Sequence, residues 1–388
     1  MITTLLIATG IWRGVLSTPG GELPFQMQID KTHSSYTLTV INGEERLTLD
    51  EITLRNDSLL ARFPVYESEL HLKINNDHSM EGSFINLTRK TNGTIPLKLT
   101  HGEPFRFRET TATTKSSKME PRYEVTFSKG TADSSSAIGV FSQTGNKVTG
   151  TFLTPSGDYR FLEGSVIGDS LFLSTFNGVF VYLFKAKILE NRVMGTFYSG
   201  THYQTSWEGI ANPKAELPDP ESLTTISDKE LPLTFTFPDT DSLPVSLIDP
   251  KFANKVIVIQ ILGSWCPNCL DETTFLAPFY DRYREKGVEI IGLAFEKTDD
   301  FSRAAANVRR LQKRFSIHYQ LLIASNRDKI KATMPRLNNF IGFPTTIILD
   351  KNHKVRKIHA GFSGQATGIE FERYKDAFEL YINKLVSE

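Results

Sequence analysis

The two cysteines of this 388-residue chain, Cys266 and Cys269, lie three positions apart. A thiolate attacks a disulfide sulfur, and a second thiol close by resolves the mixed disulfide that forms. A disulfide framework would spread its cysteines along the chain, and a structural zinc site would need further ligands at matching spacings. The eight histidines are scattered and form no HxxxH or HExxH pair. The cysteines are therefore redox-active or incidental, and no metal site is expected.

The sequence around the cysteines predicts a strand followed by a helix. Residues 255–262 are a continuous β-branched run, typical of a strand buried on both faces. Residues 269–286 are expected to form a helix with a kink at Pro278. A cysteine at the start of a helix meets unpaired N–H groups and the positive end of the helix dipole, which favour its thiolate. Pro267 suits the first helical position, where a missing N–H costs nothing, so this context favours the redox interpretation.

Strands and helices alternate from about residue 231 to the end of the chain. This alternation predicts an α/β domain over 231–388, with a largely parallel centre and an antiparallel hairpin at one edge. The further strands are expected at 288–295, 318–324, 344–350 and 354–362, and the further helices at 299–315, 326–340 and 371–388.

Residues 1–211 are predicted to form a β-rich domain whose role the sequence does not give. Short runs rich in Thr, Val, Ile, Phe and Tyr alternate with turns, and Asn-Gly pairs at 42–43, 92–93 and 177–178 indicate hairpins. A loose Gly-x-aromatic pattern recurs along this half, which favours an antiparallel meander closing into a barrel or sandwich. Residues 212–230 contain three prolines and little apolar content, and are predicted to be a linker.

Composition and charge argue against several kinds of partner. The 44 basic and 44 acidic side chains cancel, so neither nucleic acid nor an anionic membrane is an expected partner. No run of 18 apolar residues exists, and no transmembrane segment is expected. The apolar stretch at 5–8 is too short for the core of a signal peptide, and no Lys or Arg precedes it. Either the protein is made without a signal peptide, or the recorded start lies downstream of the real one. No cofactor is expected.

Residues 255–362 resemble the thioredoxin superfamily, and within it the TlpA/ResA-like disulfide reductases of bacterial envelopes, which are related to the AhpC/TSA group. The resemblance rests on the Trp-Cys-Pro-Asn-Cys sequence at 265–269 and on Gly-Phe-Pro-Thr-Thr at 342–346. It extends over about 231–388 and implies a thioredoxin fold. It further implies a thiol–disulfide oxidoreductase that acts on protein disulfides or dithiols in cell redox homeostasis. A location in the bacterial periplasm or cell envelope and a membrane electron donor follow from the same resemblance.

The resemblance also implies roles for individual residues. Cys266 would attack the substrate, and Cys269 would resolve the mixed disulfide, so that the two form a redox-active disulfide. Trp265, Phe343 and Pro344 would line the substrate side of this centre, with Pro344 in the cis configuration.

Glu272 occupies the place where ResA-like proteins carry an acid close to the thiols. It follows Cys269 by three residues and so shares a helix face with it. A partly buried carboxylate there could accept the Cys269 proton and tune the thiol pKa values, or it could be a solvated acid. Gln260 stands where thioredoxins place a buried acid, and Asn268 where many relatives have proline. The intervening pair affects the reduction potential, so the redox direction stays open.

Two other functions remain open at this point. One is a thiol-dependent peroxidase of the AhpC/TSA group, although Gly263 stands where such enzymes usually have Thr. The other is a non-catalytic binding module, in which the β-rich half docks a partner and the thioredoxin-like half is redox-regulated or passive.

Overall fold

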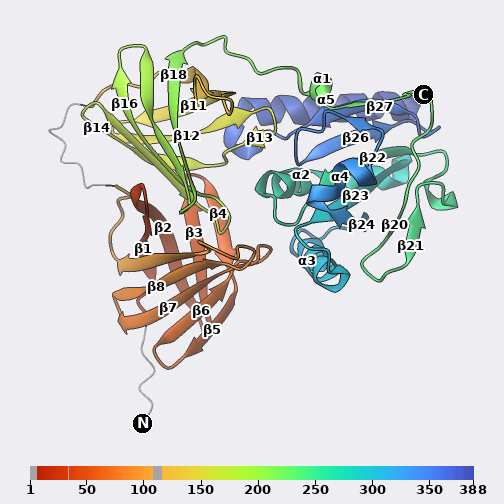
Figure 1. The fold of residues 1–388 in the computed structure, drawn as a ribbon. Coiled ribbons are helices and arrows are strands. Elements are labelled where there is room, and N and C mark those ends of the chain that lie inside the picture. The colour runs from red at the N-terminus through yellow and green to blue at the C-terminus, as the bar shows by residue number, and fades with distance from the viewer. Residues whose placement is uncertain (1–6, 34, 108–115) are drawn as a thin grey trace. The chain divides into compact units, whose positions relative to one another are not determined.

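The computed structural model describes residues 7–33, 35–107 and 116–388 (Figure 1). The first two residues of the apolar stretch at 5–8 lie outside these ranges. The chain divides into two compact units. The first contains residues up to 152 together with 159–216, and the second contains residues 153–158 together with 217–388.

The first part of the N-terminal unit is an antiparallel meander. Its strands run in the order β4-β3-β2-β1-β9-β8-β7-β6-β5. Apolar side chains alternate with polar ones along most of them, as in a sheet with one face buried. The strands are β1 Gly10–Thr18, β2 Gly21–Thr32, β3 Ser35–Asn42, β4 Glu45–Leu49, β5 Glu51–Arg55, β6 Ser58–Arg62, β7 Ser68–Asn76, β8 Ser79–Asn86 and β9 Thr94–His101.

A second antiparallel sheet follows in the order β11-β10-β18-β17-β16-β15-β14-β12-β13, and β11 also pairs with β12, which closes it. An aromatic core fills this barrel-like sheet, including Phe152, Phe184 and Trp207. The strands are β10 Arg122–Phe127, β11 Ser135–Thr144, β12 Lys147–Thr154, β13 Gly157–Asp158, β14 Leu162–Ile167, β15 Ser170–Phe176, β16 Val181–Leu189, β17 Arg192–Ser199 and β18 Tyr203–Ala211.

A buried arginine joins the two sheets of the first unit. The Arg106 guanidinium donates to the Ser174 carbonyl at 3.1 Å and to Asn42 Oδ1 at 3.0 Å. Its Nε lies 3.8 Å from the Glu163 carboxylate. Burial alone would raise the pKa of Glu163, but Arg106, Lys147 and a backbone N–H outweigh burial and lower it. The two sheets are thus held together by a buried, paired charge.

The structure confirms the antiparallel, barrel-like prediction for the N-terminal half and adds that two sheets are present. The Asn-Gly positions do lie between paired strands, but two of the loops are longer than a two-residue turn. In the β15–β16 loop, for example, Asn177 Oδ1 accepts from the N–H groups of Val179 and Phe180. The amide side chain therefore stabilises a wider turn than the dipeptide predicts.

The second unit contains a mixed sheet in the order β24-β23-β22-β26-β27. β22, β23 and β24 are parallel, whereas β26 and β27 form the antiparallel edge hairpin. Every residue of β22 is buried, as its continuous apolar run predicts. The strands are β22 Val256–Leu262, β23 Val288–Glu296, β24 Gln320–Asn326, β26 Thr345–Leu349 and β27 Val355–Ala360. The thioredoxin-fold prediction is confirmed.

Every helix in the described ranges lies in this second unit. The three long ones are α2 Pro267–Tyr283, which contains Pro278, α3 Phe301–Arg314 and α5 Ile369–Ser387. Asp300 caps α3 by accepting from the Arg303 N–H at 3.1 Å. The helix predicted at 326–340 is shorter than expected, with 3₁₀ turn η3 Arg327–Lys329, α4 Ile330–Thr333 and strand β25 Leu337–Asn338. The other short helical turns are η1 Pro250–Phe252, η2 Arg284–Lys286 and η4 Gln365–Thr367.

The segment predicted as a linker, 212–230, contains ordered elements. Helical turn α1 Pro220–Leu223 begins at the cap Asp219, and β19 Thr225–Ile226 pairs with β25. Strands β20 Thr236–Pro238 and β21 Pro244–Ser246 then form a small hairpin. The longer segment of the second unit runs from Leu217 to Glu388 and so includes most of the segment predicted as a linker. Within the described residues, no helix has the length and apolar content that a membrane crossing requires.

Candidate redox site

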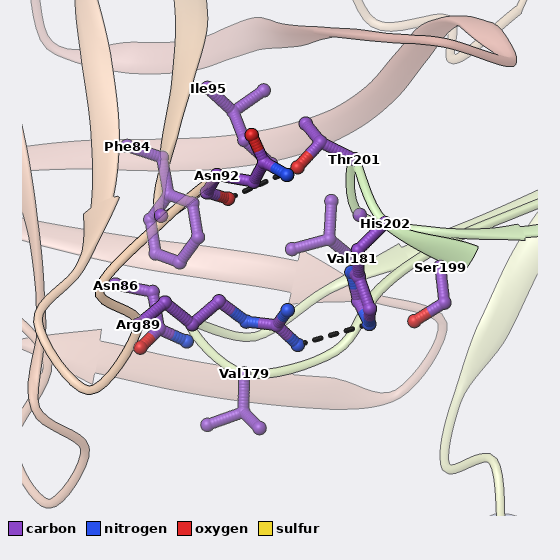
Figure 2. A pocket seen from close by; sticks show the side chains of 12 residues that line it. Phe84, Asn86, Arg89, Asn92, Ile95, Val179, Val181, Ser199, Thr201 and His202 are labelled. Carbon is purple, nitrogen blue, oxygen red and sulfur yellow. Dashed lines mark hydrogen bonds between the residues drawn. The ribbon is translucent and has the colours of Figure 1, made fainter.

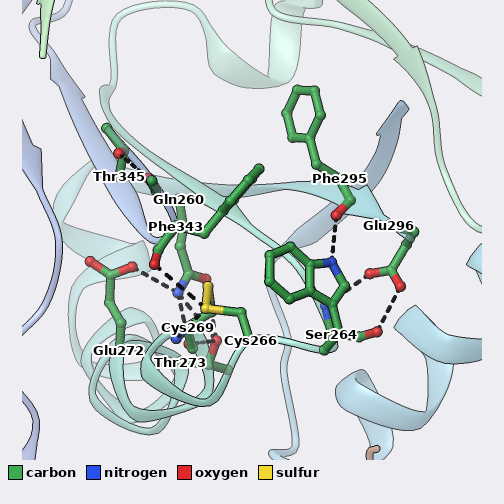
Figure 3. Close-up of a disulfide and its surroundings, with 12 residues drawn as sticks. Gln260, Ser264, Cys266, Cys269, Glu272, Thr273, Phe295, Glu296, Phe343 and Thr345 are labelled. Carbon is green, nitrogen blue, oxygen red and sulfur yellow. Dashed lines mark hydrogen bonds between the residues drawn. A yellow bond between two sulfur atoms is a disulfide. The ribbon is translucent and has the colours of Figure 1, made fainter. Parts of the chain in front are cut away.

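The two cysteines lie where β22 meets α2, and they form a disulfide (Figure 3). Cys266 is the N-cap of α2, with its Sγ accepting from the Cys269 N–H at 3.2 Å. Pro267 follows in the first turn, the position predicted for it. The free N–H groups of this turn favour negative charge on Cys266 Sγ when the pair is reduced.

The loop before β26 faces the attacking cysteine. Cys266 Sγ lies 3.6 Å from the Phe343 carbonyl oxygen, and the Phe343–Pro344 peptide bond is cis, as the resemblance implies. The Phe343 ring meets the Trp265 indole edge to face, at 5.3 Å between centroids. The three residues expected on the substrate side thus lie next to the disulfide.

Glu272 is fully buried on α2, so it is not a solvated acid. Its carboxylate accepts from Gln260 Nε2 at 2.9 Å and from the Thr346 hydroxyl. Gln260 Nε2 also lies 3.2 Å from the Cys269 carbonyl oxygen, and Tyr319 donates to Gln260 Oε1 at 3.3 Å. Gln260 therefore connects the carboxyl group to the backbone of the second cysteine.

Burial raises the pKa of Glu272 to about 7, against an ordinary value of 4.5. The hydrogen bonds from Thr346 and Gln260 oppose this rise because they stabilise the charged form, but burial outweighs them. A carboxyl group with such a pKa can both take up and release a proton near neutral pH.

A second buried carboxylate fixes the loop before Cys266. Glu296, at the end of β23, accepts from the Ser264 N–H at 2.8 Å and from the Ser264 hydroxyl at 2.7 Å. The neighbouring Trp265 donates its indole N–H to the Phe295 carbonyl at 2.9 Å. Glu296 was not expected from the sequence, because 32 positions separate it from Ser264 and its only signal is its place after a buried strand.

The first unit contains a small pocket whose polar side chains include Arg89, Asn92 and His202 (Figure 2). Arg89 Nη2 lies 3.1 Å from His202 Nε2, and the Thr201 hydroxyl donates to the Asn92 carbonyl at 3.0 Å. Burial and the neighbouring Arg89 lower the pKa of His202, which favours the neutral ring. These polar groups form hydrogen bonds with one another and do not point together toward a place where a ligand could bind. The disulfide therefore remains the candidate functional site.

Comparison with known proteins agrees with the geometry. The sequence model of the family described as Redoxin matches residues 226–377. The second unit is therefore similar to Redoxin domains. The chain is 28% identical over 157 residues to the thiol-disulfide oxidoreductase ResA of Bacillus thuringiensis, covering 40% of this chain and 77% of that protein. The ResA protein of Geobacillus thermodenitrificans is 29% identical over 112 residues, covering 28% of this chain and 57% of that one.

The solved structures that the chain matches include a thiol:disulfide interchange protein of the thioredoxin family from Chlorobium tepidum. It is 18% identical, with a TM-score of 0.32, and the match covers 44% of this chain and 99% of that one. The resemblance drawn from the two sequence motifs agrees with the Redoxin match and with the similarity to the ResA proteins.

Proposed function

We propose that this protein is a thiol–disulfide oxidoreductase that acts on protein disulfides or dithiols through Cys266 and Cys269. The observation that carries the proposal is the disulfide at the N-terminus of α2, with Cys266 Sγ beside the Phe343 carbonyl. The similarity to proteins named thiol-disulfide oxidoreductase supports the same reaction.

In the reducing direction, the Cys266 thiolate attacks one sulfur of the substrate disulfide. The substrate S–S bond breaks, one substrate sulfur leaves as a thiolate, and a mixed disulfide forms at Cys266. Cys269, once deprotonated, then attacks Cys266 Sγ and displaces the second substrate sulfur. Two electrons pass from the protein dithiol to the substrate, which takes up two protons as it becomes a dithiol.

Glu272 is proposed as the group that exchanges a proton with Cys269. Position i+3 on α2 places the carboxyl group on the helix face of Cys269. A pKa of about 7 allows the carboxylate to accept the Cys269 proton before the resolving attack. Gln260 and Thr346 act as positioning residues, because they hold both carboxyl oxygens.

Trp265, Phe343 and Pro344 are proposed to contact the substrate next to its reacting sulfur. The proposal is supported by the Phe343 carbonyl next to Cys266 Sγ and by the contact of the Phe343 ring with Trp265. The family similarity supports a location in the bacterial periplasm or cell envelope, with a membrane protein as electron donor that reduces the disulfide after each turnover.

A trapping experiment tests the mechanism. In Cys269→Ser, the mixed disulfide at Cys266 has no resolving thiol, so reduced protein incubated with insulin should accumulate a covalent adduct visible on a non-reducing gel. The double variant Cys266→Ser/Cys269→Ser is the matched control and should form none. Absence of an adduct in a folded Cys269→Ser protein would refute the mechanism.

A further inference from the structure

A short hairpin from the middle of the chain belongs to the same compact unit as the redox disulfide. Residues 153–158 group with 217–388, although the residues before and after them belong to the first unit. Within the hairpin, Leu153 pairs with Asp158 and Thr154 with Gly157, and the Thr154 hydroxyl donates to the Gly157 carbonyl at 2.9 Å. We call residues 153–158 the site hairpin.

The site hairpin contacts the redox motif itself. Gly157 has φ +140°, and a Cβ added to it would overlap the amide group of Asn268. Asn268 lies between the two cysteines and is only 8% exposed, while Cys266 is 5% exposed. Glycine at 157 therefore allows the hairpin backbone to lie directly on the motif.

The same hairpin contacts the backbone on the other side of the site. A Cβ on Gly361 would lie 2.6 Å from the Pro155 carbonyl oxygen, and one on Gly342 would lie 3.4 Å from Ser156 Cβ. Gly361 in turn donates its N–H to the Pro344 carbonyl at 2.9 Å. The hairpin thus lies along the segment that faces Cys266.

One charged hydrogen bond fixes the hairpin in place. The Gly364 N–H donates to Asp158 Oδ2 at 2.6 Å, and Asp158 is only 2% exposed. Hydrogen bonds to a buried carboxylate are stronger than neutral ones. Asn268 Oδ1, by contrast, is buried without a hydrogen-bond partner among the described residues. An unsatisfied amide oxygen disfavours the covered arrangement and regains a partner when the hairpin moves away.

We propose that the site hairpin selects the substrates of the redox site. With the hairpin in place, Cys266 reacts with disulfides carried by small molecules or by thin, extended chain segments, and the surface of a folded protein reaches it only after the hairpin moves. This inference rests on the proposed thiol–disulfide exchange at Cys266 and adds the class of substrate that the site accepts.

Single-turnover oxidation of the reduced protein tests whether the site hairpin favours small disulfides over those of folded proteins. Glutathione disulfide serves as the small substrate and insulin as the folded protein. Asp158→Ala removes the acceptor of the Gly364 N–H, and the ratio of the insulin rate constant to the glutathione disulfide rate constant should rise about tenfold. Asp158→Asn keeps a neutral oxygen acceptor and should raise the ratio by less, about threefold, because its hydrogen bond is weaker than that of the carboxylate. Asp133→Ala, in an exposed turn of the first unit, is the control for the loss of a carboxylate.

A second variant keeps the proposal testable if Asp158→Ala does not fold. Ser156 is exposed at the hairpin tip, so Ser156→Trp enlarges the hairpin where the fold has room. It should slow the reaction with insulin at least threefold while leaving the reaction with glutathione disulfide unchanged. If the ratio of the insulin to the glutathione disulfide rate constant is unchanged in folded Asp158→Ala or folded Ser156→Trp, the proposal that the hairpin selects substrates is wrong. If native protein oxidises with neither substrate, the proposed exchange reaction itself has failed.

Discussion

The buried carboxyl group of Glu272 should impose a specific pH dependence on stability. Its pKa is about 7 in the folded protein, and the ordinary value of 4.5 applies when the chain unfolds. Because the folded pKa is raised, the protonated form favours folding. The stabilising contribution is fully present below pH 4.5 and is lost as pH rises through 7. At about 1.4 kcal/mol per pKa unit, the gap between the two values corresponds to about 3 kcal/mol.

Glu272→Gln removes this titration while preserving the shape of the side chain. The Gln side chain can accept from Gln260, and the Thr346 hydroxyl can rotate to accept from its amide. At pH 5 the variant and the native protein should have free energies of unfolding within about 1 kcal/mol of each other. At pH 8 the variant should be the more stable by about 3 kcal/mol, because only the native protein then holds a buried carboxylate.

Guanidinium unfolding of the oxidised proteins, followed by circular dichroism at 222 nm, measures this difference. The described helices all lie in the second unit, so the signal reports on the unit that contains Glu272. Glu285→Gln is the matched control, since the Glu285 side chain is 90% exposed and should give no pH-dependent difference. A stability difference between Glu272→Gln and native protein that stays constant from pH 5 to pH 8 would refute the reasoning.

Two further substitutions test the buried charges outside Glu272. Ser264→Ala removes the hydroxyl donor to Glu296 and should lower the free energy of unfolding of the second unit by about 1–3 kcal/mol, measured by the same circular dichroism signal. Arg106→Met removes the buried cation beside Glu163, leaving it only the partly exposed Lys147, and also removes the donors to Ser174 and Asn42. The substitution should lower the free energy of unfolding of the first unit by about 3–5 kcal/mol, measured by the fluorescence of its buried tryptophans. Arg46→Met is its control, because exposed Arg46 donates to the carbonyls of Gly43 and Glu45, which are close to it in sequence. Equal losses for the two variants would contradict a special role for Arg106.

Much of the redox site was predictable because its parts are local in sequence. Cys266, Pro267 and Cys269 follow a buried strand, and Glu272 is one helical turn further on. Pro344 was found through its own motif. The environment of Glu272 was not predictable, since the groups that hold its carboxylate come from two other strands, β22 and β26. Gln260 looked like a missing acid in the sequence, whereas in the structure it is the donor that holds an acid supplied by the helix.

The contact between the site hairpin and the redox motif was also not predictable from the sequence. Pro155, Gly157 and Asp158 have the composition of an ordinary surface turn. Nothing in such a turn reveals that Gly157 lies against Asn268, because the contact is between residues more than a hundred positions apart. The predicted linker at 212–230 has the same explanation. Its composition indicates a loop, but β19 is ordered by pairing with a strand more than a hundred residues later.

The separation of Asp158 from Gly364, 206 residues along the chain, has a consequence for biosynthesis. At about 5–20 residues per second, the ribosome adds the residues between them in about 10–40 s. During that interval the site hairpin has been made but its partner backbone has not. The hydrogen bond between Asp158 and Gly364 therefore forms only after nearly the whole polypeptide has been synthesised, and until then the hairpin must remain soluble without it. Its short, polar and glycine-containing sequence meets that requirement.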